Sequence, residues 1–230
     1  MKTIGLIGGM SWESTVSYYQ IINSTIKEQL GGFHSAKIIL YSVDFPEIEE
    51  CQTKGDWGKG ALILTEAAQK LEKAGADFIA ICTNTMHKVA PKIQERISVP
   101  ILHIADATVD KLKKNNIHKV ALLGTKYTMT QDFYKERIKQ HGIDVIIPDE
   151  DDVELVNHVI YDELCLGNIN DDSRKEFIRI IELLKKRGAE GVILGCTEIG
   201  LLVQQKDSPL PVFDTTQIHG HTIAMMAIEK

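Results

Sequence analysis

The sequence has few of the features that mark secreted, membrane-bound or metal-dependent proteins. Its four cysteines, Cys51, Cys82, Cys165 and Cys196, are spread over 230 residues without a CxxC pair, so neither a disulfide framework nor a zinc site is predicted. No apolar run approaches the ~20 residues of a membrane-spanning helix. The formal net charge is −6, which disfavours a nucleic-acid partner. We therefore expect a cytoplasmic protein with reduced thiols.

Cofactor motifs are equally scarce. The glycines within residues 5–9 (GLIGG) follow the start of an apolar segment, but their spacing differs from the GxGxxG of a dinucleotide site. The eight histidines contain no HExxH pattern, and their one HxH pair, His219 and His221, lies on the predicted last helix. His87 and His103 follow predicted strands and are expected in solvent-facing or core positions, with a supporting role at the site as the alternative. No role is assigned to His219 or His221. No lysine has the surroundings of a Schiff-base site, so we expect no cofactor and no metal.

What the sequence does contain is an internal repeat. Residues 74–85 (AGADFIAICTNT) align with residues 187–198 (RGAEGVILGCTE) at a constant offset. Each copy reads glycine, alanine, acid, apolar run and polar tip, which indicates a buried parallel strand that opens onto a helix. The alignment places Thr83 opposite Cys196, so a hydroxyl and a thiol occupy matched strand ends. Open α/β sheets bind ligands at these carboxyl ends.

Strand and helix patterns alternate along the chain, and the series restarts near Lys119. Strands are predicted at 3–8, 37–43, 78–83 and 100–104, and again at 119–125, 144–147, 191–196 and around 210–216. The longer helices are predicted at 12–30, 58–73, 106–114, 132–140, 150–166, 173–186 and from 216 to the end. This order predicts an α/β protein of two similar domains with parallel sheets, related by duplication. The predicted domains are 1–105 with 216–230, and 106–215.

Cys196 is the strongest single candidate for chemistry. It stands between a strand end and a helix, a position that lowers the pKa of a thiol. Thr83 at the matched position can also cap a helix, and Asn84 and Thr85 add donors suited to an anion. Cys82, whose counterpart in the repeat is a glycine, is expected in the core. A buried and inert Cys196 stays the alternative.

Two acid–base groups without a cofactor suit proton transfer at carbon. One group removes a proton and the other returns one from the opposite face of the carbon. Fixed donors then hold the substrate carboxylate and the enolate-like charge that develops. A turn at Met10 and Ser11, just after the first strand, is expected to line the same pocket.

Three motifs carry a resemblance to a known family. GLIGGMSWEST, CTNTMH and GCTEI, in this order over the full length, resemble the aspartate/glutamate racemase family of cofactor-independent enzymes, and within it the bacterial L-aspartate/glutamate-specific type. The resemblance implies two α/β domains with the active site in the cleft between them, commonly in a homodimer. It also implies one catalytic cysteine per domain. Cys196 matches the second, and Thr83 replaces the first.

The resemblance also implies a set of substrate contacts. Asn84, Thr85 and Thr197 match positions that bind the substrate carboxylate in the family, and Met10 matches its first glycine-rich loop. The family's side-chain arginine and lysine are replaced here by Ile48 and Cys165. Gln52, one helical turn beyond Ile48, is expected to supply part of the missing recognition through hydrogen bonds. The expected substrate contacts are Met10, Ser11, Gln52, Asn84, Thr85, Cys165 and Thr197.

The leading hypothesis is therefore racemisation of L-aspartate, L-glutamate or both, with Cys196 and Thr83 exchanging the Cα proton. A broader-specificity amino-acid racemase is one alternative, and a single-thiol decarboxylase or isomerase on the same scaffold is another. A two-lobed amino-acid-binding protein would also show duplicated α/β halves. It would not need a thiol at a strand end.

Overall fold

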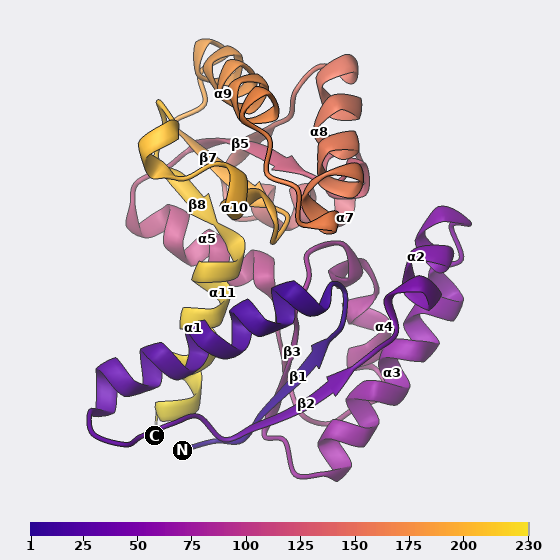
Figure 1. Cartoon of the computed structure of the whole chain (residues 1–230). Coiled ribbons are helices and arrows are strands. Elements are labelled where there is room, and N and C mark those ends of the chain that lie inside the picture. The colour runs from indigo at the N-terminus through magenta and orange to yellow at the C-terminus, as the bar shows by residue number, and fades with distance from the viewer. Residues whose placement is uncertain (230) are drawn as a thin grey trace. The chain divides into compact units, whose positions relative to one another are not determined.

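The computed structural model describes residues 1–229, and the chain forms two compact units (Figure 1). The first unit comprises Met1–Ile104 and the chain from Thr216 onward, and the second comprises Ala105–Thr215. Each unit contains one parallel four-stranded sheet. The predicted α/β class with two similar halves is confirmed.

The two sheets have the same strand order. The first runs β2-β1-β3-β4 and the second runs β6-β5-β7-β8, with every pair parallel. The strands of the first sheet are β1 Ile4–Gly8, β2 Ile38–Ser42, β3 Phe78–Ile81 and β4 Ile101–Leu102. Those of the second are β5 Lys119–Gly124, β6 Asp144–Ile146, β7 Gly191–Gly195 and β8 Val212–Asp214. In each sheet the strand of the internal repeat, β3 or β7, lies beside the first strand of its unit.

Helices connect the strands in both units. The first unit contains α1 Trp12–Leu30, α2 Phe45–Thr53, α3 Trp57–Lys73, the 3-10 helix η1 Thr85–Val89, α4 Ala90–Gln94 and, apart from its first residue, α11 Thr215–Ile228. The second contains α5 Ile104–Lys114 apart from its first residue, α6 Lys126–Thr130, α7 Asp132–Lys139, α8 Glu150–Asp162, η2 Leu164–Leu166, α9 Asp171–Lys186, α10 Ile199–Leu202 and η3 Gln205–Asp207.

Local signals in the sequence explain the bounds of α1. The hydroxyl oxygen of Ser11 accepts a hydrogen bond from the Ser14 N–H at 3.3 Å, which satisfies one of the unpaired donors at the helix start. The helix ends before Gly31, whose φ of 73° suits glycine. The predicted helix 12–30 is confirmed at both ends.

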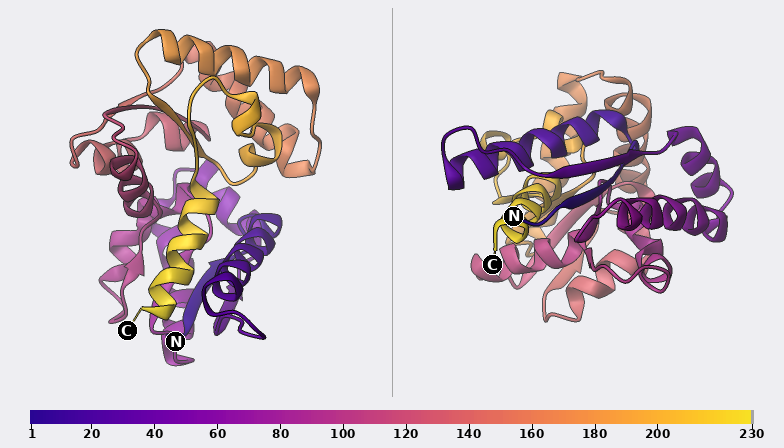
Figure 2. Two further views of the ribbon diagram at one scale, coloured as in Figure 1. Left: turned by 90° about the vertical axis from the view of Figure 1, so that its left-hand side faces the viewer. Right: turned by 90° about the horizontal axis from the view of Figure 1, so that it is seen from below.

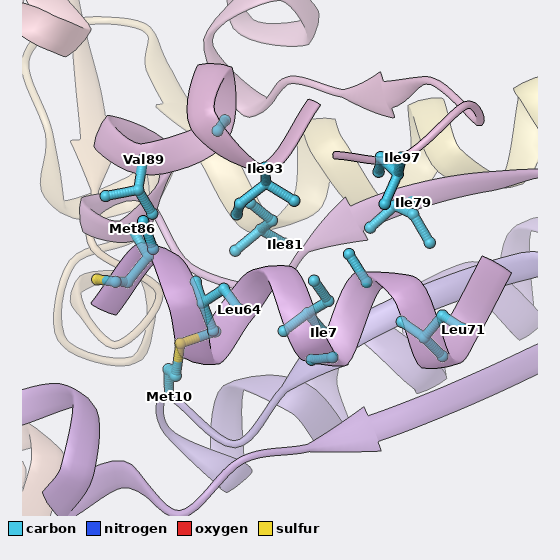
Figure 3. Packing of buried hydrophobic residues seen from close by; sticks show 14 of the residues in the cluster. Ile7, Met10, Leu64, Leu71, Ile79, Ile81, Met86, Val89, Ile93 and Ile97 are labelled. Carbon is cyan, nitrogen blue, oxygen red and sulfur yellow. The ribbon is translucent and has the colours of Figure 1, made fainter. Parts of the chain in front are cut away.

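The sheet of the first unit is covered on both faces. On one face, α1 and α11 lie side by side (Figure 2), and Tyr18, Ile22 and Ile26 pack with Ile223 and Ala224. On the other face, α3 and the segment after β3 form a second cluster that includes Ile7, Met10, Leu64 and Met86 (Figure 3). Removing a fully buried side chain such as Leu64 costs roughly 2–5 kcal/mol. These two layers hold the carboxyl ends of β1 and β3 in a fixed frame.

The second unit is built in the same way. Strand β7 is buried along its whole length, and β5 is buried from its second residue on. Helices α8 and α9 pack against β5. Helix α9 contributes Phe177, Ile180, Ile181 and Leu184 as a buried stripe, which is the spacing of an amphipathic helix.

The acids of the internal repeat have the same structural role in both units. The carboxylate of Asp77 accepts a hydrogen bond from the Thr3 N–H at 2.5 Å. The carboxylate of Glu190 accepts hydrogen bonds from the N–H groups of His118 and Lys119 at 2.6 and 3.2 Å. Each acid therefore satisfies backbone donors at the start of the neighbouring strand. This equivalence supports the duplication that the repeat indicated.

Some predicted elements differ from those observed. The helix expected over 150–166 ends at Asp162, where Glu163 leaves the helical region and η2 follows. The predicted strand 78–83 ends two residues earlier, at Ile81. Helix α6 was not predicted; it begins after Thr125, whose hydroxyl oxygen accepts a hydrogen bond from the Thr128 N–H. In each case the bounds of the element are decided by a tight turn or by the hydrogen bonds of a polar side chain, and not by the apolar pattern of the sequence.

Candidate active site

The first candidate half-site is the turn from β3 into η1, called here the Thr83 turn (residues 82–85). Its backbone is held from several sides. The Cys82 N–H donates to the Ile7 carbonyl at 2.9 Å, and the Ser14 hydroxyl donates to the Cys82 carbonyl at 3.4 Å. The His87 ring binds the Thr83 carbonyl at 2.7 Å. Thr83 itself is partly exposed, while Asn84 and Thr85 are buried.

The loop between β1 and α1 borders this turn through Ser14. Gly9 has a φ of 89°, and a Cβ there would lie 2.2 Å from the Val43 carbonyl, so glycine is required. The Gly9 N–H donates to the Thr15 hydroxyl at 2.9 Å. The Met10 side chain is only 4% exposed and packs in the core cluster (Figure 3). The Met10 side chain thus contributes to the core of the first unit, and Ser11 is engaged as the cap of α1.

The remaining predicted contact of the first unit is Gln52. It lies on α2 and is buried, one turn after Ile48, which is fully buried. Ile48 belongs to the same core cluster as Ile7 and Leu64. A core side chain at position 48 cannot replace a charged one. Among the buried residues of α2, which are Ile48, Cys51 and Gln52, Gln52 is the one with a polar amide.

The second half-site is the turn from β7 into α10, called here the Cys196 turn (residues 195–198). The Cys196 thiol donates a hydrogen bond to Glu198 Oε2 at 3.0 Å. The Thr197 hydroxyl donates to the same oxygen at 2.6 Å. Glu198 is only 6% exposed. A nearly buried carboxylate thus accepts two hydrogen bonds from the residues that precede it.

Glu198 is a site residue that the sequence reasoning missed. It stands in the quoted GCTEI motif, and the repeat aligns it with Thr85. The feature of the sequence that could have identified it is the difference between the two copies of the repeat, since one has a carboxylate where the other has a neutral hydroxyl. Residues two apart do not face each other in a helix, but the turn brings the Cys196 thiol and the Glu198 carboxylate together.

The predicted lowering of the Cys196 pKa is wrong. Burial raises its pKa well above the usual value, and the Glu198 carboxylate and the neighbouring Cys165 thiol raise it further. The following helix α10 has only four residues and begins three residues later, so few peptide dipoles are aligned to favour a thiolate. Cys196 therefore rests as a protonated thiol near neutral pH.

The helix predicted after Thr83, through Met86 and Val89, is present but begins as a 3-10 helix. Thr85 begins the five-residue 3-10 helix η1, and the side chain of Asn84 does not cap it. Asn84 and Thr85 are only 2% and 4% exposed. An anion site at this turn would therefore depend on the particular donors of Asn84 and Thr85 and much less on a helix dipole.

The other cysteines separate into buried and partly exposed groups. Cys82 is fully buried in the core, as predicted, and burial alone raises its pKa. Cys51 is also buried, and its raised pKa has burial as the largest cause. Cys165 lies in η2, is partly exposed and is close enough to influence the Cys196 thiol. The second unit thus brings Cys165, Cys196, Thr197 and Glu198 together.

Two general properties bear on the site. Within residues 1–229, no group of three or more histidine, cysteine, aspartate or glutamate side chains has an arrangement that could hold a metal ion. None of the helices in the same range combines the length and the apolar character needed to cross a bilayer.

The fold and the two strand-end turns define a duplicated α/β protein of the racemase type. Residues 7–222 match the sequence profile of the Asp/Glu/hydantoin racemase family. The chain belongs to that family.

Individual relatives agree with this assignment. The chain is 27% identical over 216 residues to the broad specificity amino-acid racemase RacX of Bacillus subtilis (strain 168), covering 93% of this chain and 92% of that protein. A crystal structure of a candidate Asp/Glu racemase from Yersinia pestis is 56% identical, with full coverage of both chains and a TM-score of 0.94. That of an aspartate racemase homologue from Pyrococcus horikoshii OT3 is 38% identical, with full coverage of both and a TM-score of 0.87.

Proposed function

We propose that this protein is a cofactor-independent amino-acid racemase that moves the Cα proton between Cys196 and Thr83. The observation that carries the proposal is the thiol–carboxylate contact of the second unit, where Cys196 donates to Glu198 at 3.0 Å. Family membership and the matched position of Thr83 in the first unit support it. A binding protein would not need a thiol hydrogen-bonded to a carboxylate.

The first step is the activation of Cys196. Because the resting thiol is protonated, it must lose its proton before it can act as a base. Glu198 accepts the hydrogen bond of this thiol and is the group that can take the proton. The thiolate then removes the Cα proton of the L amino acid, and the carbon becomes an enolate-like carbanion.

The second step is the return of a proton from the opposite face. The Thr83 hydroxyl donates its proton to Cα and regains one from water, while protonated Glu198 releases the original thiol proton to water. Cys196 keeps the proton that came from the substrate. One proton enters on the Thr83 side and one leaves on the Glu198 side, so the reaction balances and the D amino acid carries a solvent proton.

The substrate carboxylate is assigned to both turns. Asn84 and Thr85 supply an amide and a hydroxyl in the Thr83 turn, and Thr197 supplies a hydroxyl in the Cys196 turn. Such donors stabilise the charge that develops on the carboxylate as the Cα proton leaves. In this proposal one substrate engages both half-sites.

For the side chain we propose two candidates: L-aspartate or L-glutamate, which the likeness to the aspartate racemase homologue of Pyrococcus horikoshii OT3 supports, and uncharged amino acids. Gln52 and Ile48 are uncharged in α2, and Cys165 is uncharged in η2. Glu198 adds a negative charge beside Cys196, which opposes a second carboxylate on the substrate. These residues favour the candidate of uncharged amino acids, as does the similarity to RacX, a broad specificity amino-acid racemase. Cys165 and Gln52 are the proposed side-chain contacts.

Exchange of the Cα proton in D2O tests the function directly. The protein is incubated with L and D forms of aspartate, glutamate, glutamine, serine and lysine, and the Cα signal is followed by proton NMR with chiral chromatography of the products. We expect L substrates to give D products that carry deuterium at Cα. Tight binding without exchange for every amino acid would favour the binding protein, and release of carbon dioxide without inversion would favour the decarboxylase.

A further inference from the structure

Three buried histidines form a chain of rings in the first unit. His87, His103 and His219 are 1%, 6% and 0% exposed. The centroids of the His87 and His103 rings are 4.5 Å apart, and those of His87 and His219 are 5.8 Å apart. The Tyr18 ring meets His219 edge-on at 5.6 Å. The proposed reaction uses none of these residues.

The hydrogen bonds of His87 determine which of its nitrogens carries the proton. Its Nδ1 lies 2.7 Å from the Thr83 carbonyl oxygen, and its Nε2 lies 3.2 Å from the Ile104 backbone N. A carbonyl can only accept and a backbone N–H can only donate. His87 is therefore neutral, with its proton on Nδ1 and a lone pair on Nε2.

His219 has the opposite tautomer by the same argument. Its Nε2 lies 3.0 Å from the Leu102 carbonyl oxygen, so this nitrogen carries the proton. Its Nδ1 lies 2.9 Å from the Tyr18 hydroxyl and accepts a hydrogen bond from it. His219 is thus held by α1 and by the end of β4, and its ring packs against that of His87.

The His87 ring takes the place of a backbone donor at the Thr83 turn. In an α-helix the N–H of residue 87 would bond the carbonyl of residue 83. Here the His87 N–H bonds the Asn84 carbonyl at 3.1 Å instead, and the Thr83 carbonyl accepts from the imidazole of the same residue. The ring therefore fixes the peptide plane between Thr83 and Asn84, and with it the directions of both side chains.

We propose that His87 is a positioning residue that sets the direction of the Thr83 hydroxyl through the Thr83 carbonyl. The Ile104 N–H locks the required tautomer. This inference rests on the proposed role of Thr83 in proton transfer. In this proposal the positioning of Thr83 depends on the N–H donor at Nδ1 and does not depend on the size of the ring.

Two variants separate the donor from the ring. Asparagine at position 87 places an amide N–H close to the position of Nδ1, and leucine has similar bulk without a donor. We expect His87→Leu to lower kcat about tenfold or more with little change in KM, because small displacements of a reacting group reduce rates steeply. His87→Asn should restore kcat to within about threefold of the wild type.

Tyr18→Phe is the matched control, because it removes a buried hydrogen bond from the same group without touching His87. It should lower the melting temperature but leave kcat within about threefold. Circular dichroism confirms that each variant folds. The proposal fails if His87→Asn is as impaired as His87→Leu, or if Tyr18→Phe lowers kcat as much as His87→Leu does.

A second measurement does not depend on activity. Long-range ¹H–¹⁵N NMR of the full chain with labelled histidine reports which ring nitrogen is protonated, and single-histidine variants assign the signals. We expect the proton on Nδ1 in His87 and on Nε2 in His219. A proton on Nε2 of His87 overturns the inference even in an active enzyme. If both histidines have the expected tautomers but the protein racemises no amino acid, the proposed function is overturned. The hydrogen bond from His87 to the Thr83 carbonyl is then still supported.

Discussion

The Thr83 turn and the Cys196 turn have the same backbone frame but differ in chemistry. Both follow the strand that lies beside the first strand of its unit, and both follow an acid that binds the start of that first strand. At the tip, the first turn has a buried thiol and then a hydroxyl, whereas the second has a glycine and then a thiol. Duplicated strands can therefore keep the same backbone arrangement while a few residues at the turns give each copy a different chemical role.

The two thiols illustrate this division. Burial alone raises the pKa of Cys82, whose side chain lies in the core of the first unit. Burial also raises the pKa of Cys196, but there the Glu198 carboxylate adds to the effect and accepts the thiol hydrogen bond. A raised pKa marks an inert group in the first case and a group beside its proton acceptor in the second. The comparison teaches that the contact partner, more than the size of a pKa shift, distinguishes a reactive thiol.

The largest expected effect comes from removing the thiol of the second turn. Cys196→Ala should lower kcat at least ~1000-fold, because an alanine side chain cannot accept the Cα proton. The measurement is Cα deuterium exchange together with circular dichroism to establish folding.

Cys82→Ala is the matched control for this variant. It removes a core thiol of the first unit, so it should reduce stability slightly and leave kcat within about twofold. An inactive Cys82→Ala beside an active Cys196→Ala would reverse the assignment of the two turns.

The next effect sharpens the comparison by separating the carboxylate from the thiol. Glu198→Gln should lower kcat about 100-fold, because an amide cannot accept the thiol proton. The same change removes a negative charge, so the Cys196 pKa should fall and the thiolate fraction at a given pH should rise. Alkylation of Cys196 by iodoacetamide should therefore become faster while racemisation becomes slower.

The pH dependence checks the sign of this argument. A thiol whose pKa is raised is protonated at neutral pH, so alkylation of wild-type Cys196 should increase about tenfold per pH unit through the range where ordinary thiols level off near ~8.5. In Glu198→Gln the same curve should shift to lower pH. Mass spectrometry of the Cys196 peptide gives the rate, and a wild-type plateau at or below the ordinary value would contradict the raised pKa.

A smaller effect is expected from removing a proposed substrate-binding side chain of the Thr83 turn. Asn84→Ala removes a charge-assisted hydrogen bond to the substrate carboxylate, worth roughly 1.5–3 kcal/mol, so kcat/KM should fall about tenfold to a hundredfold. Thr197→Ala makes the corresponding change in the second turn, and the pair of values measures how the two turns share the carboxylate. An unchanged kcat/KM for Asn84→Ala would remove it from the substrate contacts.

The smallest expected effect makes the two turns alike. Thr83→Cys should raise kcat severalfold for the D amino acid and change kcat for the L amino acid less, because a thiol is a far stronger acid than a threonine hydroxyl. The ratio kcat/KM must stay equal for both hands, since their equilibrium constant is one. The measurement is kcat for each enantiomer. Equal kcat values for the L and D enantiomers in the wild type would show that Thr83 is not a weaker acid–base group than Cys196.

The sequence by itself determined the frame of this protein. The repeat of residues 74–85 and 187–198 located β3 and β7 and placed Thr83 opposite Cys196. The cap at Ser11 and the glycine at position 31 gave both ends of α1. These features depend on periodicity and on backbone conformation within a few residues, which a sequence displays directly.

The tertiary structure alone decided the chemistry at the two tips. The pKa of Cys196 depends on burial and on a carboxylate that the turn folds back onto the thiol. The role of His87 depends on the Ile104 N–H, and that of His219 on Tyr18, 201 residues away in the chain. Local patterns carry no information on such partners, because electrostatic shifts and tautomers are set by distances between groups that only the packed fold brings together.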